Sequence, residues 1–295
     1  LLGRVFNVFG ETIDKKGKDN NIKALCKAAD MISEKKFDVL INLHPNERCS
    51  FIDFLAKVPV KVGFSHFLFR SFLTKVTRLN RKMHAADMYI DVLAQLGVID
   101  LSNNGLEIFP GADDKKVANA FWQEQQVIAE DKLIGFNIGS AVKTKRWAPE
   151  RFAQVADALA AKGYKTVFFG GTMDETMVKE AIGFMKTKPI IATGRFTIGQ
   201  LAAAMKRCQL IITNDSGPMH VAISQKVPIV AMYGPSSPEL YGPYTKNATI
   251  VTSVPPCTGC TKGMKHECDD MQCMTRLTVE QVIEASEKWL KNCKT

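Results

Sequence analysis

The chain has 295 residues, of which 46% are hydrophobic, and it carries a formal net charge of +9. This length favours two domains of ordinary size, and no apolar stretch approaches the roughly 20 residues that a membrane-spanning helix needs. The charge is spread along the chain rather than gathered in a block of Lys and Arg, which argues against nucleic acid as a partner. It fits an anionic ligand, an anionic membrane surface, or solubility alone.

The first part of the chain predicts alternating helices and strands. The expected elements are a helix over 22–32, strands over 37–43 and 60–64, a helix over 85–96, and a polar helix over 113–126. A polar stretch over 126–131 follows the last of these helices. We therefore expect a first domain over residues 1–128.

The second part alternates more regularly. Strands are expected over 132–139, 166–169, 189–192, 209–213 and 228–233, with helices over 149–162, 175–185, 197–207 and 218–225. Strands separated by helices in this way indicate a parallel sheet with right-handed crossovers, which is the doubly wound α/β class. A capping box at Thr278 opens a last helix. We expect a second domain over residues 129–276 and a terminal helix over 277–295.

The run from Asn214 to His220 is the sharpest candidate for a binding site. An apolar strand leads into Asp215, Ser216, Gly217, Pro218, Met219 and His220. Ser216 can cap the next helix, Gly217 lets the backbone approach a ligand, and Pro218 suits the first helical turn. Free N–H groups at a helix start bind phosphate, and ligands collect at the carboxyl edge of open α/β sheets. We predict a phosphate-bearing ligand here; the alternative is a well-capped turn without a ligand.

Three other loops follow strands of the same sheet. In the first, Ser140 and Thr144 can donate hydrogen bonds to phosphate oxygens and Lys145 can neutralise them, although a basic surface loop would have the same composition. In the second, Glu175 can accept from ribose hydroxyls, or can serve only as a favourable charge in a first helical turn. The third loop, over 234–238, ends at the same sheet edge.

Four of the eight cysteines cluster near the C-terminus. They are Cys257, Cys260, Cys268 and Cys273, with His266 among them. The first pair has the spacing of a metal knuckle, but the second pair does not. A structural zinc, paired disulfides and reduced thiols remain open. We expect a structural role rather than a catalytic one, and a disulfide is the less favoured form in a reducing cytosol.

The segment over 64–84 mixes aromatic, aliphatic and basic residues. Such a mixture suits contact with a membrane surface. It is also typical of a surface element that packs its apolar side on the core, and both interpretations stay open.

These motifs resemble glycosyltransferase family nine, the ADP-heptose:lipopolysaccharide heptosyltransferases. The resemblance extends from about Lys15 to the C-terminus. It is carried by Lys145-Arg146-Trp147, the run Asn214 to His220, Tyr233-Gly234-Pro235-Ser236, Tyr241-Gly242-Pro243, and the cysteine cluster before the final helix.

The resemblance implies a GT-B fold, in which two Rossmann-like domains face a cleft and the last helix crosses back to the first domain. The nucleotide-diphosphate sugar would bind the C-terminal domain. The groups implied for the diphosphate are Lys145 and the backbone amides of Ser216, Gly217 and Pro218. Asp215 would hold sugar hydroxyls, Glu175 the ribose, and His220 would line the site.

The implied reaction is an inverting transfer. A carboxylate base takes the proton of the acceptor hydroxyl, and the nucleoside diphosphate leaves with its charge stabilised by Lys145 and without a metal ion. Family members carry the base in a Gly-Asp loop after their first strand. No matching loop occurs in this chain, so we expect the first βα unit to precede residue 1 and assign no base. The implied donor is ADP-heptose, and the acceptor is an anionic glycolipid at the inner face of a bacterial cytoplasmic membrane.

Three alternative functions compete with this transferase. A nucleotide-sugar 2-epimerase would use the same fold without an acceptor. A nucleotide-sugar-binding module without turnover would explain the unassigned base. An NAD-dependent oxidoreductase is disfavoured because no Gly-x-Gly-x-x-Gly motif follows an expected strand.

Overall fold

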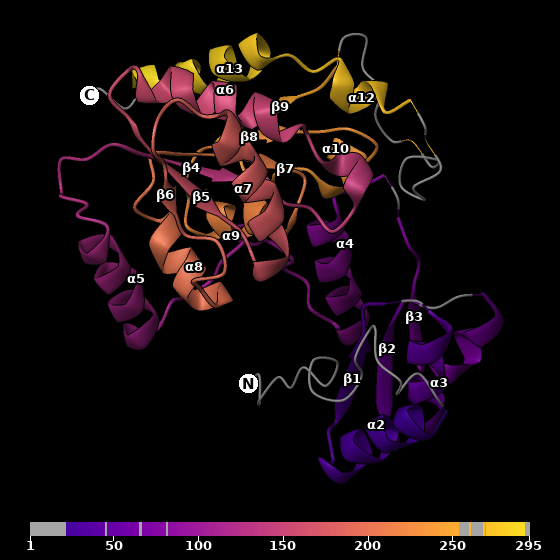
Figure 1. Cartoon of the computed structure of the whole chain (residues 1–295). Helices are drawn as coiled ribbons and strands as arrows, with labels where there is room; N and C mark the ends of the chain where they lie inside the picture. Colours follow the sequence, from indigo (N-terminus) through magenta and orange to yellow (C-terminus); the bar gives the residue numbers. More distant parts are fainter. Residues whose placement is uncertain are drawn as a thin grey trace. The chain divides into compact units, whose positions relative to one another are not determined.

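The computed structural model describes residues 22–44, 46–64, 67–80, 82–253, 260, 268 and 270–292. The chain divides into two compact units, Leu1–Asn103 and Asn104–Thr295 (Figure 1). Among the helices of the described ranges, none has the length and apolar character needed to cross a bilayer.

The first unit contains a three-stranded parallel sheet in the order β1-β2-β3. Its elements are α2 (Ile22–Glu34), β1 (Val39–Asn42), α3 (Glu47–Leu55), β2 (Val60–Phe64), η1 (Phe67–Phe72), β3 (Lys75–Thr77), α4 (Ala85–Asp91) and η2 (Val92–Leu96). Helices α2 and α3 pack together through buried Ala28, Ile32 and Ile52. The sequence predicts neither α3 nor β3, because α3 lacks a clear apolar period and β3 has three residues among basic ones.

The turn between β1 and α3 is closed by its own side chains. Asn46 caps α3, since its Oδ1 accepts from the backbone N–H of Cys49 at 2.7 Å. Asn42, the last residue of β1, donates from Nδ2 to Oδ2 of the buried Asp53, and Lys61 Nζ donates to the main-chain oxygen of Asp53. Burial raises the pKa of Asp53 to about 6, although the Asn42 hydrogen bond and the Lys61 charge act in the opposite direction.

The second unit is a six-stranded parallel sheet in the order β6-β5-β4-β7-β8-β9. Its strands are β4 (Leu133–Asn137), β5 (Lys165–Phe169), β6 (Ile190–Ile191), β7 (Leu210–Asn214), β8 (Ile229–Met232) and β9 (Ala248–Val251). Every residue of β4, β7 and β8 is buried, as expected for central strands covered on both faces. The predicted doubly wound parallel sheet is confirmed. Only β9, an edge strand, was not expected.

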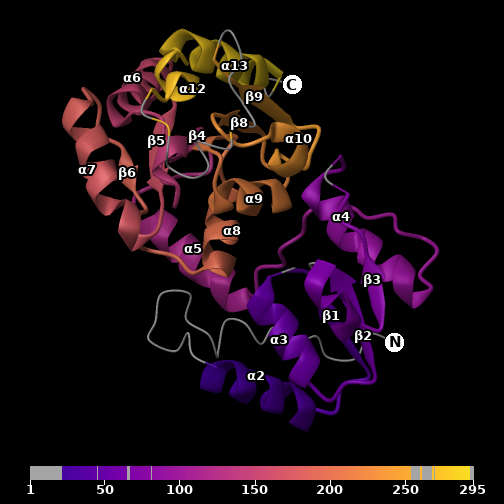
Figure 2. The same ribbon diagram turned by 90° about the vertical axis from the view of Figure 1, so that its right-hand side faces the viewer.

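Helices cover both faces of this sheet (Figures 1 and 2). They are α5 (Ala112–Glu124), η3 (Lys143–Lys145), α6 (Pro149–Ala160), η4 (Thr172–Asp174), α7 (Glu175–Phe184), α8 (Ile198–Met205), α9 (Gly217–Ser224), α10 (Pro238–Tyr241), α12 (Gln272–Thr275) and α13 (Val279–Asn292). One apolar core joins the sheet to α6, α7 and α13, and a second joins it to α5, α8 and α9. The strand ends therefore sit on a framework that is held rigid from both sides.

Helices α5 and α13 bear on where the expected domains begin and end. The sequence pattern places the boundary near residue 128, after α5, whereas the compact units divide after Asn103. The difference arises because Phe121 and Trp122 of α5 are buried in the core shared with α8. Helix α13 packs on α6; its expected return to the first domain stays a prediction.

Candidate functional site

The candidate site lies where the order of strands in the second unit reverses. The chain starts at β4, moves outward through β5 and β6, and returns to β7 on the other side of β4. The loops that leave β4 and β7 therefore diverge at the carboxyl edge of the sheet. Open α/β sheets bind their ligands at such a reversal.

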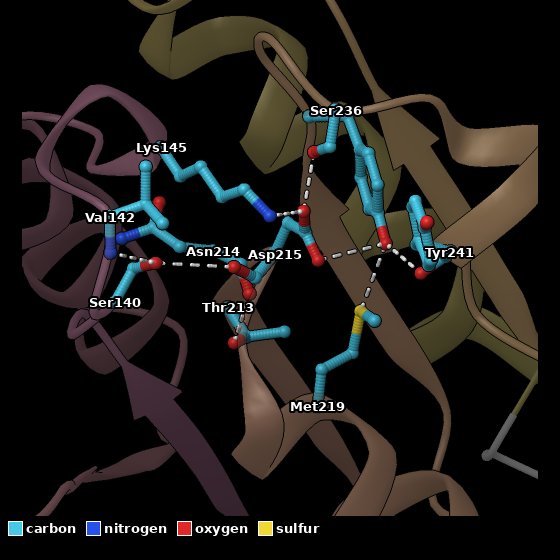
Figure 3. Close-up of polar contacts among 10 residues, drawn as sticks. Ser140, Val142, Lys145, Thr213, Asn214, Asp215, Met219, Ser236 and Tyr241 are labelled. Carbon is cyan, nitrogen blue, oxygen red and sulfur yellow. Dashed lines mark hydrogen bonds and ion pairs between the residues drawn. The ribbon is translucent and has the colours of Figure 1, made fainter. Parts of the chain in front are cut away.

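Lys145 and Asp215 connect these two loops. Lys145 Nζ lies 2.7 Å from Asp215 Oδ2, and the side chains are 14% and 6% exposed, as the close-up shows (Figure 3). The sequence predicts each residue separately for a phosphate-bearing ligand, and the structure brings them into one ion pair. A pair buried to this degree leaves an uncompensated charge if either partner is removed.

Two residues of the loop after β8 complete the surroundings of Asp215. Ser236, which is buried, donates from its hydroxyl to Asp215 Oδ2, and the hydroxyl of Tyr233 lies 3.3 Å from Oδ1. Burial, reinforced by the Asp215 carboxylate, raises the pKa of Tyr233, so the phenol stays protonated and can donate. Sequence analysis assigns no role to Ser236 or Tyr233, although both belong to the motif that carries the family resemblance.

Helix α9 starts directly after Asp215 and Ser216, and no side-chain hydrogen bond from its N-cap residue caps its first turn. Ser216 occupies the N-cap position, but its side chain makes no capping bond; its Oγ instead accepts from Asn137 Nδ2 at 2.8 Å. The expectation that the Ser216 side chain caps this helix is therefore wrong. Because Asn137 occupies one lone pair, the Ser216 hydroxyl keeps its own proton for another acceptor. A Cβ added at Gly217 would meet no atom within 4 Å, so this position is open to a ligand.

The remaining residues of the run contribute less than expected. Pro218 has no N–H group and cannot donate to a phosphate. Met219 is fully buried, with its sulfur 3.7 Å from the Tyr233 hydroxyl, and its N–H donates to the Ser216 oxygen at 3.2 Å. His220 is half-buried in the first turn of α9. Ser216 and Gly217 are thus the two residues of this turn whose N–H groups can serve a ligand.

The loop after β4 is fastened to the loop after β7. Trp147 is fully buried, its backbone N–H donates to Asn214 Oδ1 at 3.1 Å, and its ring N–H donates to the Leu277 oxygen at 3.0 Å. Ser140 is buried too, and its hydroxyl lies 3.4 Å from the Asp215 main-chain oxygen. Thr144 is likewise buried. These contacts fix the position from which Lys145 reaches Asp215.

The loop after β5 carries two carboxylates at the start of α7. Glu175 is exposed at the start of α7. The neighbouring Asp174 accepts from the Gly171 N–H at 2.9 Å, and its carboxylate occupies the space where a Cβ on Gly139 would stand, only 2.1 Å from Asp174 Oδ1. The absence of a side chain at Gly139 therefore lets the loops after β4 and β5 meet, a role that the sequence alone does not indicate.

Part of the cysteine cluster lies behind these loops. Cys260, Cys268 and Cys273 line a small cavity of about 130 Å³ together with Thr144 and Pro235. Cys257 and His266 lie outside the described residues. Within the described ranges, no group of three or more His, Cys, Asp or Glu side chains is arranged to hold a metal ion.

Comparison with known proteins identifies the family of this fold. The family model for glycosyltransferase family 9 (heptosyltransferase) matches residues 25–269. Lipooligosaccharide heptosyltransferase 2 of Haemophilus influenzae is 26% identical over 230 residues, covering 74% of this chain and 66% of that protein. The chain thus spans about two thirds of the length of this relative.

Solved structures show the same architecture. A glycosyltransferase of family 9 from Veillonella parvula is 51% identical with a TM-score of 0.85, covering 95% of this chain and 81% of that one. The ADP-heptose lipopolysaccharide heptosyltransferase II of Escherichia coli is 23% identical with a TM-score of 0.76, covering 93% and 82%. These likenesses confirm the expected GT-B fold built from two Rossmann-like domains.

Proposed function

The chain belongs to glycosyltransferase family 9, and we propose that it transfers a heptose or a similar sugar from ADP-heptose to a lipopolysaccharide core acceptor. One observation carries this proposal: a buried Lys145–Asp215 pair stands beside the open start of α9, at the strand reversal of the sheet. The donor class is supported by the E. coli enzyme of the same fold, whose name specifies ADP-heptose.

The donor would be held by charge and by backbone amides. Lys145 and the N–H groups of Ser216 and Gly217 would bind the diphosphate, helped by the positive end of the α9 dipole. Asp215 would accept from sugar hydroxyls, and Glu175, at the start of α7, would accept from the ribose. Ser140 and Thr144, which are buried, would then support the loop after β4, which carries Lys145.

Transfer would proceed by direct displacement with inversion. The acceptor oxygen forms a bond to the anomeric carbon while the bond from that carbon to the diphosphate breaks, and a carboxylate takes the acceptor proton. Negative charge grows on the leaving diphosphate, where Lys145 and the start of α9 would stabilise it. These groups would do the work of a metal ion. We assign no residue of this chain as the base.

The first unit carries features that fit an anionic glycolipid at a membrane surface. Residues 44–84 contain eight Lys and Arg but two Asp and Glu, so they contribute +6 of the net +9. On this unit Leu68 is 71% exposed and Phe54 is 57% exposed, and the Phe54 ring contacts that of Phe72 at 4.8 Å. We propose that this surface touches the inner face of the cytoplasmic membrane, since exposed apolar side chains in a strongly basic segment bind anionic bilayers.

A vesicle assay tests this membrane contact. Leu68→Glu should lower co-sedimentation with vesicles of phosphatidylcholine and phosphatidylglycerol, and wild type should not bind phosphatidylcholine alone. Phe109→Glu is the matched control, because Phe109 is 83% exposed on the second unit. Equal sedimentation of all three proteins would contradict the proposed surface.

For the cysteine cluster we propose a structural zinc site. Cys260, Cys268 and Cys273 line one cavity with Pro235 and Thr144, and the Cys260 N–H donates to the Pro235 oxygen at 2.7 Å. The three thiols are not gathered around a common point, so zinc would have to draw them together. Zinc bound there would stabilise the loops after β4 and β8 without taking part in the reaction. Measuring the metal content of purified wild type and of the Cys260→Ser variant tests this proposal. Metal-free wild type would contradict the zinc site.

The transfer itself is tested by incubating the protein with ADP-heptose, with and without a heptose-deficient lipopolysaccharide acceptor. The proposed function predicts ADP release and a heavier acceptor only when both substrates are present. A changed sugar nucleotide without acceptor would favour a 2-epimerase. Binding without any product would favour a module without turnover.

A further inference from the structure

The two oxygens of the Asp215 carboxylate are not equivalent. Oδ2 receives Lys145 Nζ at 2.7 Å and the hydroxyl of Ser236. Oδ1 has one longer contact, 3.3 Å from the hydroxyl of Tyr233. That hydroxyl has a single proton, and the main-chain oxygen of Tyr241 lies closer to it, at 2.8 Å. Because a carboxylate oxygen accepts about two hydrogen bonds, Oδ1 retains capacity that Oδ2 has already used.

Ser236 is presented to Asp215 by a loop that cannot shift easily. Gly234 is packed so closely that a Cβ would lie 2.6 Å from Met274 Sδ. The next residue, Pro235, accepts from the Cys260 N–H at 2.7 Å. Ser236 itself is 2% exposed. Its hydroxyl is thus a fixed, neutral donor aimed at Oδ2 (Figure 3).

We propose that Ser236 is a positioning residue for the sugar half of the donor. Its hydroxyl, together with Lys145, holds Oδ2 and thereby sets the plane of the Asp215 carboxylate, so that Oδ1 meets a sugar hydroxyl. When the diphosphate draws the charge of Lys145, Ser236 stays on Oδ2 and keeps the carboxylate in place. This inference rests on the proposed function, because it requires a nucleotide sugar beside Asp215.

The consequence is a division of labour that binding can measure. Lys145 would serve the phosphates of any nucleotide, whereas Ser236 would matter only for a ligand that carries a sugar. A purely structural serine would weaken both kinds of ligand alike. The ratio of the affinities for ADP-heptose and ADP therefore separates the two roles.

Isothermal titration of ADP and of ADP-heptose into wild type and Ser236→Ala provides the test. Losing a hydrogen bond to a charged group should weaken ADP-heptose by about tenfold, while ADP binds as to wild type. Ser236→Thr keeps a hydroxyl and should restore most of the loss. Ser237→Ala is the matched control, since Ser237 precedes α10 without a capping side-chain bond.

A double-mutant cycle with Asp215→Asn completes the test. If Ser236 acts through Asp215, adding Ser236→Ala to Asp215→Asn should weaken ADP-heptose little further. Wild-type affinity for ADP-heptose in Ser236→Ala, or an equal loss for both ligands, would overturn the inference and leave the proposed function standing. A wild type that binds neither ligand would overturn the proposed function as well.

Discussion

Two turns in this chain begin alike and end differently. β1 and β7 each end at a buried Asn, and a buried Asp lies close to each turn: Asp53 within α3, and Asp215 directly after β7. In the first unit, the side chain of Asn46 accepts a hydrogen bond at the start of α3, and the Asp53 carboxylate accepts one from the Asn42 amide. In the second unit, the N-cap side chain does not bond to α9, and the Asp215 carboxylate takes Lys145.

The difference shows how similar turns can serve structure or ligand. A helix start that is capped by its own side chain has one donor fewer for an anion, whereas an uncapped start retains it. Burial favours the neutral form of the Asp53 carboxyl, and its amide hydrogen bond does not offset this preference, whereas the Asp215 carboxylate has a lysine as its ion-pair partner. We therefore expect the turn after β7, rather than the turn after β1, to bind a charged ligand.

The largest effect is expected when the second turn loses its cation. Lys145→Met leaves the Asp215 carboxylate buried and unpaired, which should lower the free energy of unfolding by about 3 kcal/mol and abolish tight ADP binding. All three tryptophans, Trp122, Trp147 and Trp289, lie in the second unit, so fluorescence reports its unfolding in urea.

Lys143→Met is the matched control for this experiment. Lys143 belongs to the same short helix, η3, but is exposed. We expect wild-type unfolding and ADP affinity for this variant. If Lys145→Met behaves in the same way, the ion pair is not what distinguishes the second turn.

The Asp53 carboxyl of α3 should show a smaller, pH-dependent effect. Its pKa of about 6 exceeds the ordinary 3.8, so the folded protein holds the proton to higher pH than the unfolded chain. The resulting stability is fully present below pH 4 and is lost as the pH rises through 6. Asp53→Asn should therefore raise the free energy of unfolding by about 2 kcal/mol at pH 8, with the gain shrinking towards pH 4.

Hydrogen exchange of α3 measures this gain within the first unit. The exposed Asp38 supplies the control, since Asp38→Asn should leave exchange unchanged at both pH values. A gain from Asp53→Asn that is the same at pH 4 and pH 8 would contradict the assigned cause, which is burial of a charge.

The smallest effect should come from the two N-cap residues. Asn46→Ala removes a capping bond and should destabilise α3 by about 1 kcal/mol, without altering ADP affinity. Ser216→Ala removes no capping bond, so α9 should exchange as in wild type while ADP binds more weakly. Hydrogen exchange and calorimetry on both variants check the contrast, and the opposite pattern would reverse the roles given to the two turns.

Much of the second unit could be predicted from its sequence. Its central strands are continuous apolar runs, and its helices show clear apolar faces, so the parallel sheet and its carboxyl edge followed from local pattern. Lys145 and Asp215 were predicted because each stands in a loop directly after such a strand. Local pattern was weaker for β3 and β9, which are short edge strands with few buried residues.

The contacts between loops could not be predicted in the same way. Asn137 and Ser216 are 79 residues apart, and Ser236 and Asp215 are 21 apart. Such contacts depend on which strands become neighbours and where each loop turns. Pattern within a loop shows that Ser236 can donate, but the folded sheet is needed to show what accepts.

The most direct test of the central account is the effect of nucleotides on the stability of the second unit. ADP at about a hundred times its dissociation constant should add about 2.7 kcal/mol to the folded state, with smaller shifts from UDP and GDP, and Lys145→Met should lose the ADP shift. This result would support an ADP-sugar site at the reversal of strand order. No shift with any of the three nucleotides would contradict the assignment of the Lys145–Asp215 turn as the donor site.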